Sequence, residues 1–121
     1  MSKKILVVED DKYLRDVIVE KLKKENYDVI EAIDGETGWQ LTVNHHPDLV
    51  ILDIILPVLN GFDYLVKLSE QSDLKKIPVI ILSNLGQAED IERGKSLGAK
   101  DYMIKAHFTP DDLMEKVKQY I

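Results

Sequence analysis

The chain has 121 residues, 45% of them hydrophobic, which is enough for one domain that buries its own core, and we expect residues 1–121 to form that single domain. Its 22 acidic and 16 basic residues give a net charge of -6, which argues against direct binding to nucleic acid or to anionic lipid surfaces. No cysteine is present, so disulfides and thiolate metal sites are excluded.

The hydropathy of the chain also argues against a membrane location. No apolar run approaches the roughly 18 residues that a membrane-spanning helix needs. The N-terminus becomes charged too soon after its first apolar run, residues 5–8, to act as a secretory signal peptide. We therefore expect a cytoplasmic protein.

Five short apolar runs recur along the chain, and a segment with helical spacing follows each of them. The runs lie at residues 5–8, around 29–30, and at 49–52, 79–82 and 102–104. Their spacing suits right-handed crossover units, so we predict an α/β fold with a doubly wound five-stranded parallel sheet and helices on both faces. In the flavodoxin-like, three-layer version of this fold the strand order is 2-1-3-4-5, which makes the first and third strands neighbours.

Residues that favour helix ends divide the predicted helices from the strands. Asn26 and Gly98 tolerate the left-handed conformation that ends a helix, and they follow the first and fourth helical segments. Asp34, Asn60 and Thr109 are suitable N-caps for the second, third and fifth helices. The local signals therefore agree with the βα rhythm.

Four of the predicted strands are followed directly by acidic, hydroxyl or amino side chains. Because the strands of a parallel sheet end at the same edge, we expect these side chains to line one cleft. They are Glu9, Asp10 and Asp11 after the first strand, Asp53 after the third, Ser83 and Asn84 after the fourth, and Lys105 after the fifth.

Carboxylates gathered in one crevice repel one another unless a cation or a retained proton neutralises them. Hard oxygen ligands favour Mg²⁺ or Mn²⁺, and Mg²⁺ commonly binds one or two carboxylates together with substrate phosphate. An aspartate such as Asp53 can then act as a nucleophile and form an acyl phosphate, with Lys105 and the Ser83 hydroxyl on its oxygens. Each element alone is also typical of a helix-start acid cluster, a strand-end cap or a solvated lysine, so the prediction depends on their convergence.

Five segments carry a family resemblance that covers almost the whole chain. They are Ile-Leu-Val-Val-Glu-Asp-Asp at 5–11, Leu-Val-Ile-Leu-Asp-Ile-Ile-Leu-Pro at 49–57, Asn-Gly at 60–61, Val-Ile-Ile-Leu-Ser at 79–83 and Gly-Ala-Lys-Asp-Tyr-Met-Ile-Lys at 98–105. Together they resemble the response-regulator receiver domain of two-component signalling.

The resemblance implies that Asp53 accepts a phosphoryl group from a histidine kinase or a phosphotransfer protein. It implies that Mg²⁺ is held by Glu9, Asp10, Asp53 and the backbone carbonyl of Ile55. Such a chain catalyses only its own phosphorylation and dephosphorylation.

The resemblance also implies a conformational switch. The Ser83 hydroxyl moves toward the phosphate and the Tyr102 ring follows it, which changes the face offered to a partner. That partner is an unidentified downstream effector or a second copy of the chain in a phosphorylation-dependent homodimer.

The sequence departs from the family pattern at three places. Most receivers have a proline after the lysine, often preceded by a cis bond, whereas this chain reads Lys-Ala-His-Phe at 105–108, so we expect a trans Lys105–Ala106 bond. Asn84 stands where a small residue is usual, and it would narrow access to the phosphate or add a hydrogen bond. Ile55 is apolar and branched, and we expect it to hinder the water that would hydrolyse the phosphoryl group.

Three histidines invite a metal or phosphotransfer interpretation. His45 and His46 lie at a predicted helix end opposite the cleft, so we expect them to be a solvated pair. His107 is nearer the cleft, and we expect it to fill the loop.

Other functions stay open at this point. A phosphatase or mutase with an aspartate nucleophile resembles Asp-x-Asp, but here the second acid is replaced by Ile55. A flavin module would need a hydroxyl- or glycine-rich phosphate loop where this chain has residues 9–11, all acidic, and no Gly-x-Gly-x-x-Gly marks a dinucleotide site. A receiver that acts only as a phosphorylation-independent scaffold is the remaining alternative.

Overall fold

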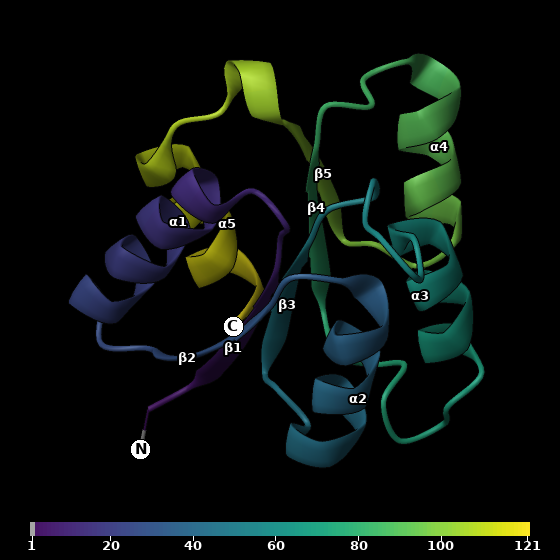
Figure 1. Cartoon of the computed structure of the whole chain (residues 1–121), viewed down its shortest axis with the longest axis horizontal. Helices are drawn as coiled ribbons and strands as arrows, with labels where there is room; N and C mark the ends of the chain where they lie inside the picture. Colours follow the sequence, from purple (N-terminus) through teal and green to yellow (C-terminus); the bar gives the residue numbers. More distant parts are fainter. Residues whose placement is uncertain (1) are drawn as a thin grey trace.

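The computed structural model describes residues 2–121, which form one parallel β-sheet with helices on both faces (Figure 1). The strands are β1 (Lys4–Val8), β2 (Asp28–Ala32), β3 (Leu49–Leu52), β4 (Val79–Ser83) and β5 (Asp101–Ile104). The helices are α1 (Lys12–Lys24), α2 (Gly35–His45), α3 (Gly61–Ser69), α4 (Ala88–Ser96) and α5 (Pro110–Tyr120), with a 3₁₀ turn at Lys105–His107.

The strand order is β2-β1-β3-β4-β5, and all neighbouring strands are parallel, so the predicted fold class and order are confirmed. In the register of the central pair, Val8 of β1 lies opposite Leu52 of β3. The residues that follow these two strands, Glu9 and Asp53, therefore leave the sheet at the same level.

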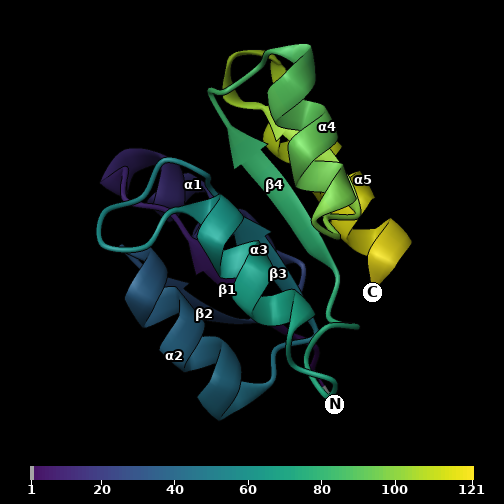
Figure 2. The same cartoon turned by 90° about the vertical axis from the view of Figure 1, so that its right-hand side faces the viewer.

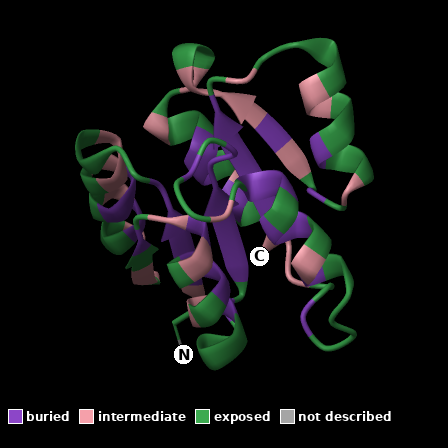
Figure 3. Ribbon diagram, turned by 45° about the vertical axis from the view of Figure 1, so that its right-hand side comes forward, coloured by how far each residue is buried: buried purple, intermediate pink, exposed green. Residues whose placement is uncertain are grey.

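Two hydrophobic clusters hold the three layers together. Alternate residues of β1 serve the two faces: Ile5 and Val7 pack in the cluster under α1 and α5, whereas Leu6 and Val8 pack in the cluster under α2, α3 and α4. Figures 1 and 2 show the two helix groups on opposite sides of the sheet. Strands β3 and β4 are buried along their whole length, as expected for central parallel strands, and the outer faces of the helices are exposed (Figure 3).

The predicted helix-end residues take the expected roles. Asn26 (φ 68°) and Gly98 (φ 111°) adopt the left-handed conformation just after α1 and α4. The side chains of Asp34, Asn60 and Thr109 accept backbone N–H bonds at the starts of α2, α3 and α5. Within residues 2–121 no helix is both long enough and apolar enough to cross a membrane.

The connection from β5 to α5 departs from the family pattern described above, and it contains no cis peptide bond. Every peptide bond among the described residues is trans, which confirms the expectation for Lys105–Ala106. A 3₁₀ turn begins at Lys105, and Phe108 then packs against the α1 and α5 cluster. His107 is exposed, and so are His45 and His46 at the end of α2, so that pair is solvated as expected.

Candidate functional site

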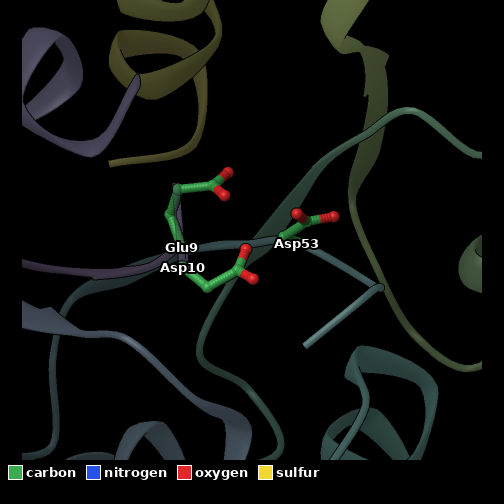
Figure 4. A group of neighbouring side chains, drawn as sticks. All are labelled: Glu9, Asp10 and Asp53. Carbon is green, nitrogen blue, oxygen red and sulfur yellow. The ribbon is translucent and has the colours of Figure 1, made fainter. Parts of the chain in front are cut away.

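Three carboxylates meet at the carboxyl ends of β1 and β3. Glu9, Asp10 and Asp53 each offer one oxygen, and these oxygens all lie within 4.8 Å of one another (Figure 4). Glu9 and Asp53 are only 2% and 4% exposed, whereas Asp10 faces solvent. The Asp53 backbone N–H donates to the Val8 carbonyl at 3.1 Å, which ties the two strand ends together. The convergence predicted from the strand ends is therefore present.

Lys105 supplies the positive charge that lies against these acids. Its Nζ donates to Asp53 Oδ2 at 2.7 Å and forms an ion pair with Glu9 Oε1 at 2.9 Å. Burial alone would lower the pKa of Lys105, but the hydrogen bonds to Asp53 and Glu9 raise it above its ordinary value. Burial raises the pKa of Glu9 to about 7, although the bond from Lys105 opposes that rise. One ammonium group thus serves two buried carboxyl groups.

The backbone after Asp53 fixes its second oxygen. Asp53 Oδ1 accepts hydrogen bonds from the N–H groups of Ile54 at 2.7 Å and Ile55 at 3.3 Å. Gly61 presses on this turn from the start of α3: its N–H donates to the Ile54 carbonyl at 2.8 Å, and a Cβ there would lie 2.5 Å from the Asp53 carbonyl oxygen. Both oxygens of Asp53 therefore have donors, and its orientation is fixed.

A tight turn follows in the loop between β3 and α3. The Leu59 N–H donates to the Pro57 carbonyl at 2.8 Å, and Val58 between them has φ 70°. Together these features make a γ-turn, which is strained for a branched residue. The loop leans on α2, because Gly35 N–H donates to the Pro57 carbonyl at 3.2 Å and a Cβ at Gly35 would lie 1.6 Å from the Leu59 oxygen.

The acids open into a cleft of about 600 Å³. Apolar side chains form part of its rim: Ile55 is 58% exposed, and Tyr13 also faces solvent. Asn84 lies at the rim, as expected from its position after β4. The lining residues are Asp10, Asp11, Lys12, Tyr13, Asp53, Ile55, Asn84 and Lys105.

Ser83 and Tyr102 are not among the residues that line this cleft, and each forms a hydrogen bond with a different backbone group of Leu85. The fully buried Ser83 Oγ accepts from the Leu85 N–H at 3.3 Å, and the Tyr102 hydroxyl donates to the Leu85 carbonyl at 2.5 Å. The Tyr102 ring is buried beside Gly94 of α4, where a Cβ would lie 3.0 Å from the ring. Their predicted role as a switch stays a prediction.

Two residues near the acids support the surrounding backbone: Asp11 has the helix-start role that the sequence allowed for these acids, and Arg15 has a role that the sequence did not indicate. Asp11 caps α1 by accepting from the Leu14 N–H at 3.1 Å. Arg15 donates from Nη1 to the backbone carbonyl of Glu9 at 2.9 Å and from Nε to Glu31 at 3.3 Å. An arginine six positions after an acid is a weak signal, because nothing in the sequence tells which backbone group it reaches.

The donor set suits a small hard cation. All three clustered side chains offer carboxylate oxygen, and sulfur and imidazole are absent from the cluster. When Glu9, Asp10 and Asp53 are ionised, the single charge of Lys105 leaves an excess of negative charge that a divalent ion would neutralise. The Ile55 carbonyl as a further ligand stays a prediction.

Comparison with known protein families gives a match over nearly the whole chain. The family described as the response regulator receiver domain matches residues 5–118. Among curated relatives, the DNA-binding dual master transcriptional regulator RpaA of Synechocystis sp. is 36% identical over 115 residues, which cover 95% of this chain and 47% of that protein. The chain spans about half the length of the curated relatives it matches.

Solved structures agree with this match. The chemotaxis protein CheY4 of Vibrio cholerae aligns with a TM-score of 0.91 at 26% identity, covering 100% of both chains. The receiver domain of the sensor histidine kinase PA1611 from Pseudomonas aeruginosa aligns with a TM-score of 0.89 at 26% identity, covering 99% of this chain and 98% of that one. The latter structure has a magnesium ion coordinated in its active site cleft.

Proposed function

The chain belongs to the response regulator receiver domain family of two-component signalling, and on that premise we propose that its Asp53 accepts a phosphoryl group from a histidine kinase or a histidine phosphotransfer protein. The observation that carries the proposal is the position of Asp53: a buried carboxylate at an open cleft, paired with Lys105 and grouped with two further acids. We propose that residues 1–121 act as one receiver domain.

We propose that Glu9, Asp10, Asp53 and the Ile55 backbone carbonyl hold Mg²⁺, with Mn²⁺ as the alternative ion. The all-oxygen donor set and the excess negative charge support this assignment. Once bound, the ion supplies positive charge to the phosphoryl oxygens and lowers the repulsion between them and the carboxylates.

The residues of the chain then have distinct tasks in the transfer. A carboxylate oxygen of Asp53 bonds to phosphorus while the bond from phosphorus to the donor histidine nitrogen breaks, and the electron pair of that bond stays on the imidazole. Lys105 neutralises an oxygen of Asp53 or of the incoming phosphoryl group, and the N–H groups of Ile54 and Ile55 keep the carboxylate oriented. The Ser83 hydroxyl binds a phosphoryl oxygen. The protein catalyses only this reaction and its own later dephosphorylation, in which water takes the phosphoryl group from Asp53 and inorganic phosphate is released.

We further propose that the switch passes through Leu85. If Ser83 turns toward the phosphoryl group, it releases the Leu85 N–H, and the same residue anchors the Tyr102 hydroxyl. The neighbouring surface of α4 and β5 would then change for an effector or for a second copy of the chain.

The output that we propose is transcriptional, because several relatives carry the name of transcriptional regulator. The net charge of -6 supports a receiver that does not itself contact DNA. We place the reaction in the cytoplasm.

Intact-mass measurement tests the proposal. The purified chain is incubated with Mg²⁺ and phosphoramidate as a small phosphate donor. We expect an adduct of about 80 Da on the wild-type chain. The adduct should be absent without Mg²⁺ and absent in Asp53→Asn. Asp28→Asn, which removes an exposed carboxylate of β2, is the matched control and should still be labelled.

Other outcomes would favour the rival functions. An unlabelled wild-type chain that binds its partner equally with and without beryllium fluoride would favour the scaffold. Steady turnover of an external phosphoester would favour a phosphatase with an aspartate nucleophile.

A further inference from the structure

Arg15 of α1 links the acidic segment 9–11, which follows β1, to the neighbouring strand β2. Its side chain is 12% exposed and lies between α1 and β2. Nη1 donates to the Glu9 carbonyl at 2.9 Å, and Nε forms an ion pair with Glu31 of β2 at 3.3 Å. The guanidinium group thus touches no carboxylate of the cluster but holds the backbone that carries two of them.

The peptide that joins Glu9 to Asp10 is fixed from several sides. The Glu9 N–H donates to the Ala32 carbonyl at 3.0 Å, which continues the pairing of β1 with β2. The Asp11 N–H donates to Glu9 Oε2 at 3.1 Å. Between these two points, Arg15 fixes the Glu9 carbonyl and hence the plane of the peptide that follows. Because Asp10 is exposed, the direction of its carboxylate depends on that backbone.

The chemistry of the contact favours arginine over lysine. A guanidinium group presents several N–H donors in a rigid fork, so it can serve the carbonyl and the Glu31 carboxylate at once, whereas an ammonium group is a single point of charge on a flexible stem. Glu31 in turn keeps the guanidinium in place.

We propose that Arg15 is a positioning residue that sets the Mg²⁺ affinity of the site by holding the Glu9–Asp10 peptide, with Glu31 as its counter-ion. The inference rests on the proposed function, since it assumes that Glu9, Asp10 and Asp53 hold the ion.

The sign of the effect separates positioning from simple electrostatics. Loss of a positive charge near a cation site should strengthen Mg²⁺ binding if only Coulomb's law matters. Loss of a group that orients the ligands should weaken it, and outer contacts of metal ligands are typically worth 10- to 100-fold in affinity.

The test is a calorimetric titration of Mg²⁺ into the phosphate-free chain. We expect Arg15→Met to raise the Mg²⁺ dissociation constant about tenfold and Arg15→Lys to recover part of the loss. Glu31→Gln should weaken binding less, and the double variant should be no weaker than Arg15→Met alone, because the two residues act through one contact. Lys21→Met is the control: it removes one positive charge and one ion pair from the same helix, with Asp111, away from the cleft.

A second readout separates positioning from general loss of structure. Labelling of Asp53 in Arg15→Met should need about tenfold more Mg²⁺ to reach half of its own maximum than labelling of the wild type, whereas a variant that has lost its structure should not be labelled at any Mg²⁺ concentration. Folded Arg15→Met or Arg15→Lys with unchanged or tighter Mg²⁺ binding would overturn the inference while leaving the proposed function intact. Failure of the wild-type chain to bind Mg²⁺ or to be labelled would instead overturn the proposed function.

Discussion

Lys105 Nζ lies 2.7 Å from Asp53 Oδ2, although 52 positions of sequence and the whole of β4 separate the two residues. The lysine reaches across the end of β4 from the 3₁₀ turn after β5 and also contacts Glu9 at the end of β1. One side chain therefore joins the ends of three strands. Its single positive charge faces two carboxyl groups that are almost fully buried.

We expect Lys105→Met to lower the free energy of unfolding by about 2 to 3 kcal/mol, because two buried carboxylates lose their cation. Mg²⁺ should restore more stability to this variant than to the wild type, since a bound ion replaces the missing charge. Urea unfolding with and without Mg²⁺ measures both effects. Lys100→Met, at an exposed lysine, is the control and should change neither. Equal stability and an equal Mg²⁺ response in Lys105→Met and wild type would contradict the interpretation.

Ile55 forms part of the cleft rim with 58% of its surface exposed. A polar side chain there would orient a water toward the phosphoryl group, whereas we expect the branched apolar chain of Ile55 to hinder its approach. We expect Ile55→Asn to shorten the half-life of phosphorylated Asp53 several-fold, by about 1 kcal/mol in activation free energy. The decay of the labelled mass after donor removal gives the half-life. Val66→Asn, in α3 and outside the cleft lining, should leave it unchanged. If phosphorylated Ile55→Asn has a half-life as long as that of the wild type, Ile55 does not hinder the hydrolytic water.

The cleft was predictable because strand ends in a parallel sheet share an edge. Glu9, Asp53 and Lys105 each follow a strand directly, so the strand order alone brings them together. Arg15 was not predictable, because its partner is a backbone carbonyl and any residue could supply that group. The left-handed Val58 was missed for a different reason: branched residues disfavour that conformation, and only the surrounding loop enforces it.

Val58 has φ 70° and 83% of its surface exposed, so the strain of its γ-turn is not offset by burial of its side chain. The left-handed region costs an ordinary residue about 1 to 2 kcal/mol, and asparagine tolerates it better. We expect Val58→Asn to raise the free energy of unfolding by about 1 kcal/mol. Ile33→Asn makes the same kind of change at an exposed site with negative φ and should give no such gain. Chemical denaturation compares them, and an unchanged midpoint for Val58→Asn would show that the turn is not strained.

Gly61 begins α3 against the turn that carries Asp53. In an ordinary first turn alanine would stabilise the helix, but a Cβ here would lie 2.5 Å from the Asp53 carbonyl oxygen and 2.8 Å from the Ile54 Cα. We expect Gly61→Ala to lower the free energy of unfolding by about 1 to 3 kcal/mol and to slow phosphorylation of Asp53. Gly86→Ala is the matched control, because the atoms nearest to its Cβ would belong to the flexible Ile104 side chain, the first of them at 3.3 Å. Equal stability of the two variants would refute the close approach.

Asp101 at the start of β5 links the stability of the fold to pH. Burial alone would raise its pKa, but bonds from the Lys116 ammonium, the Tyr102 N–H and the Tyr120 hydroxyl bring the pKa below its ordinary value of 3.8. A carboxyl group whose pKa is lowered on folding stabilises the folded state above its unfolded pKa, and this stabilisation is lost as pH falls through the folded pKa.

We therefore expect Asp101→Asn to lower the free energy of unfolding by about 1 to 2 kcal/mol at pH 7, because the charged partner of Lys116 and Tyr120 is lost. The difference from the wild type should shrink once the pH is below the ordinary pKa of 3.8, where the wild-type carboxyl group takes up its proton. Urea unfolding from pH 7 down to about 2.5 follows the difference. Asp28→Asn, at an exposed residue of β2, controls for the change in net charge. If the difference in unfolding free energy between Asp101→Asn and the wild type stays constant over this range, the packing of the side chain, and not the charge of Asp101, holds β5 to α5.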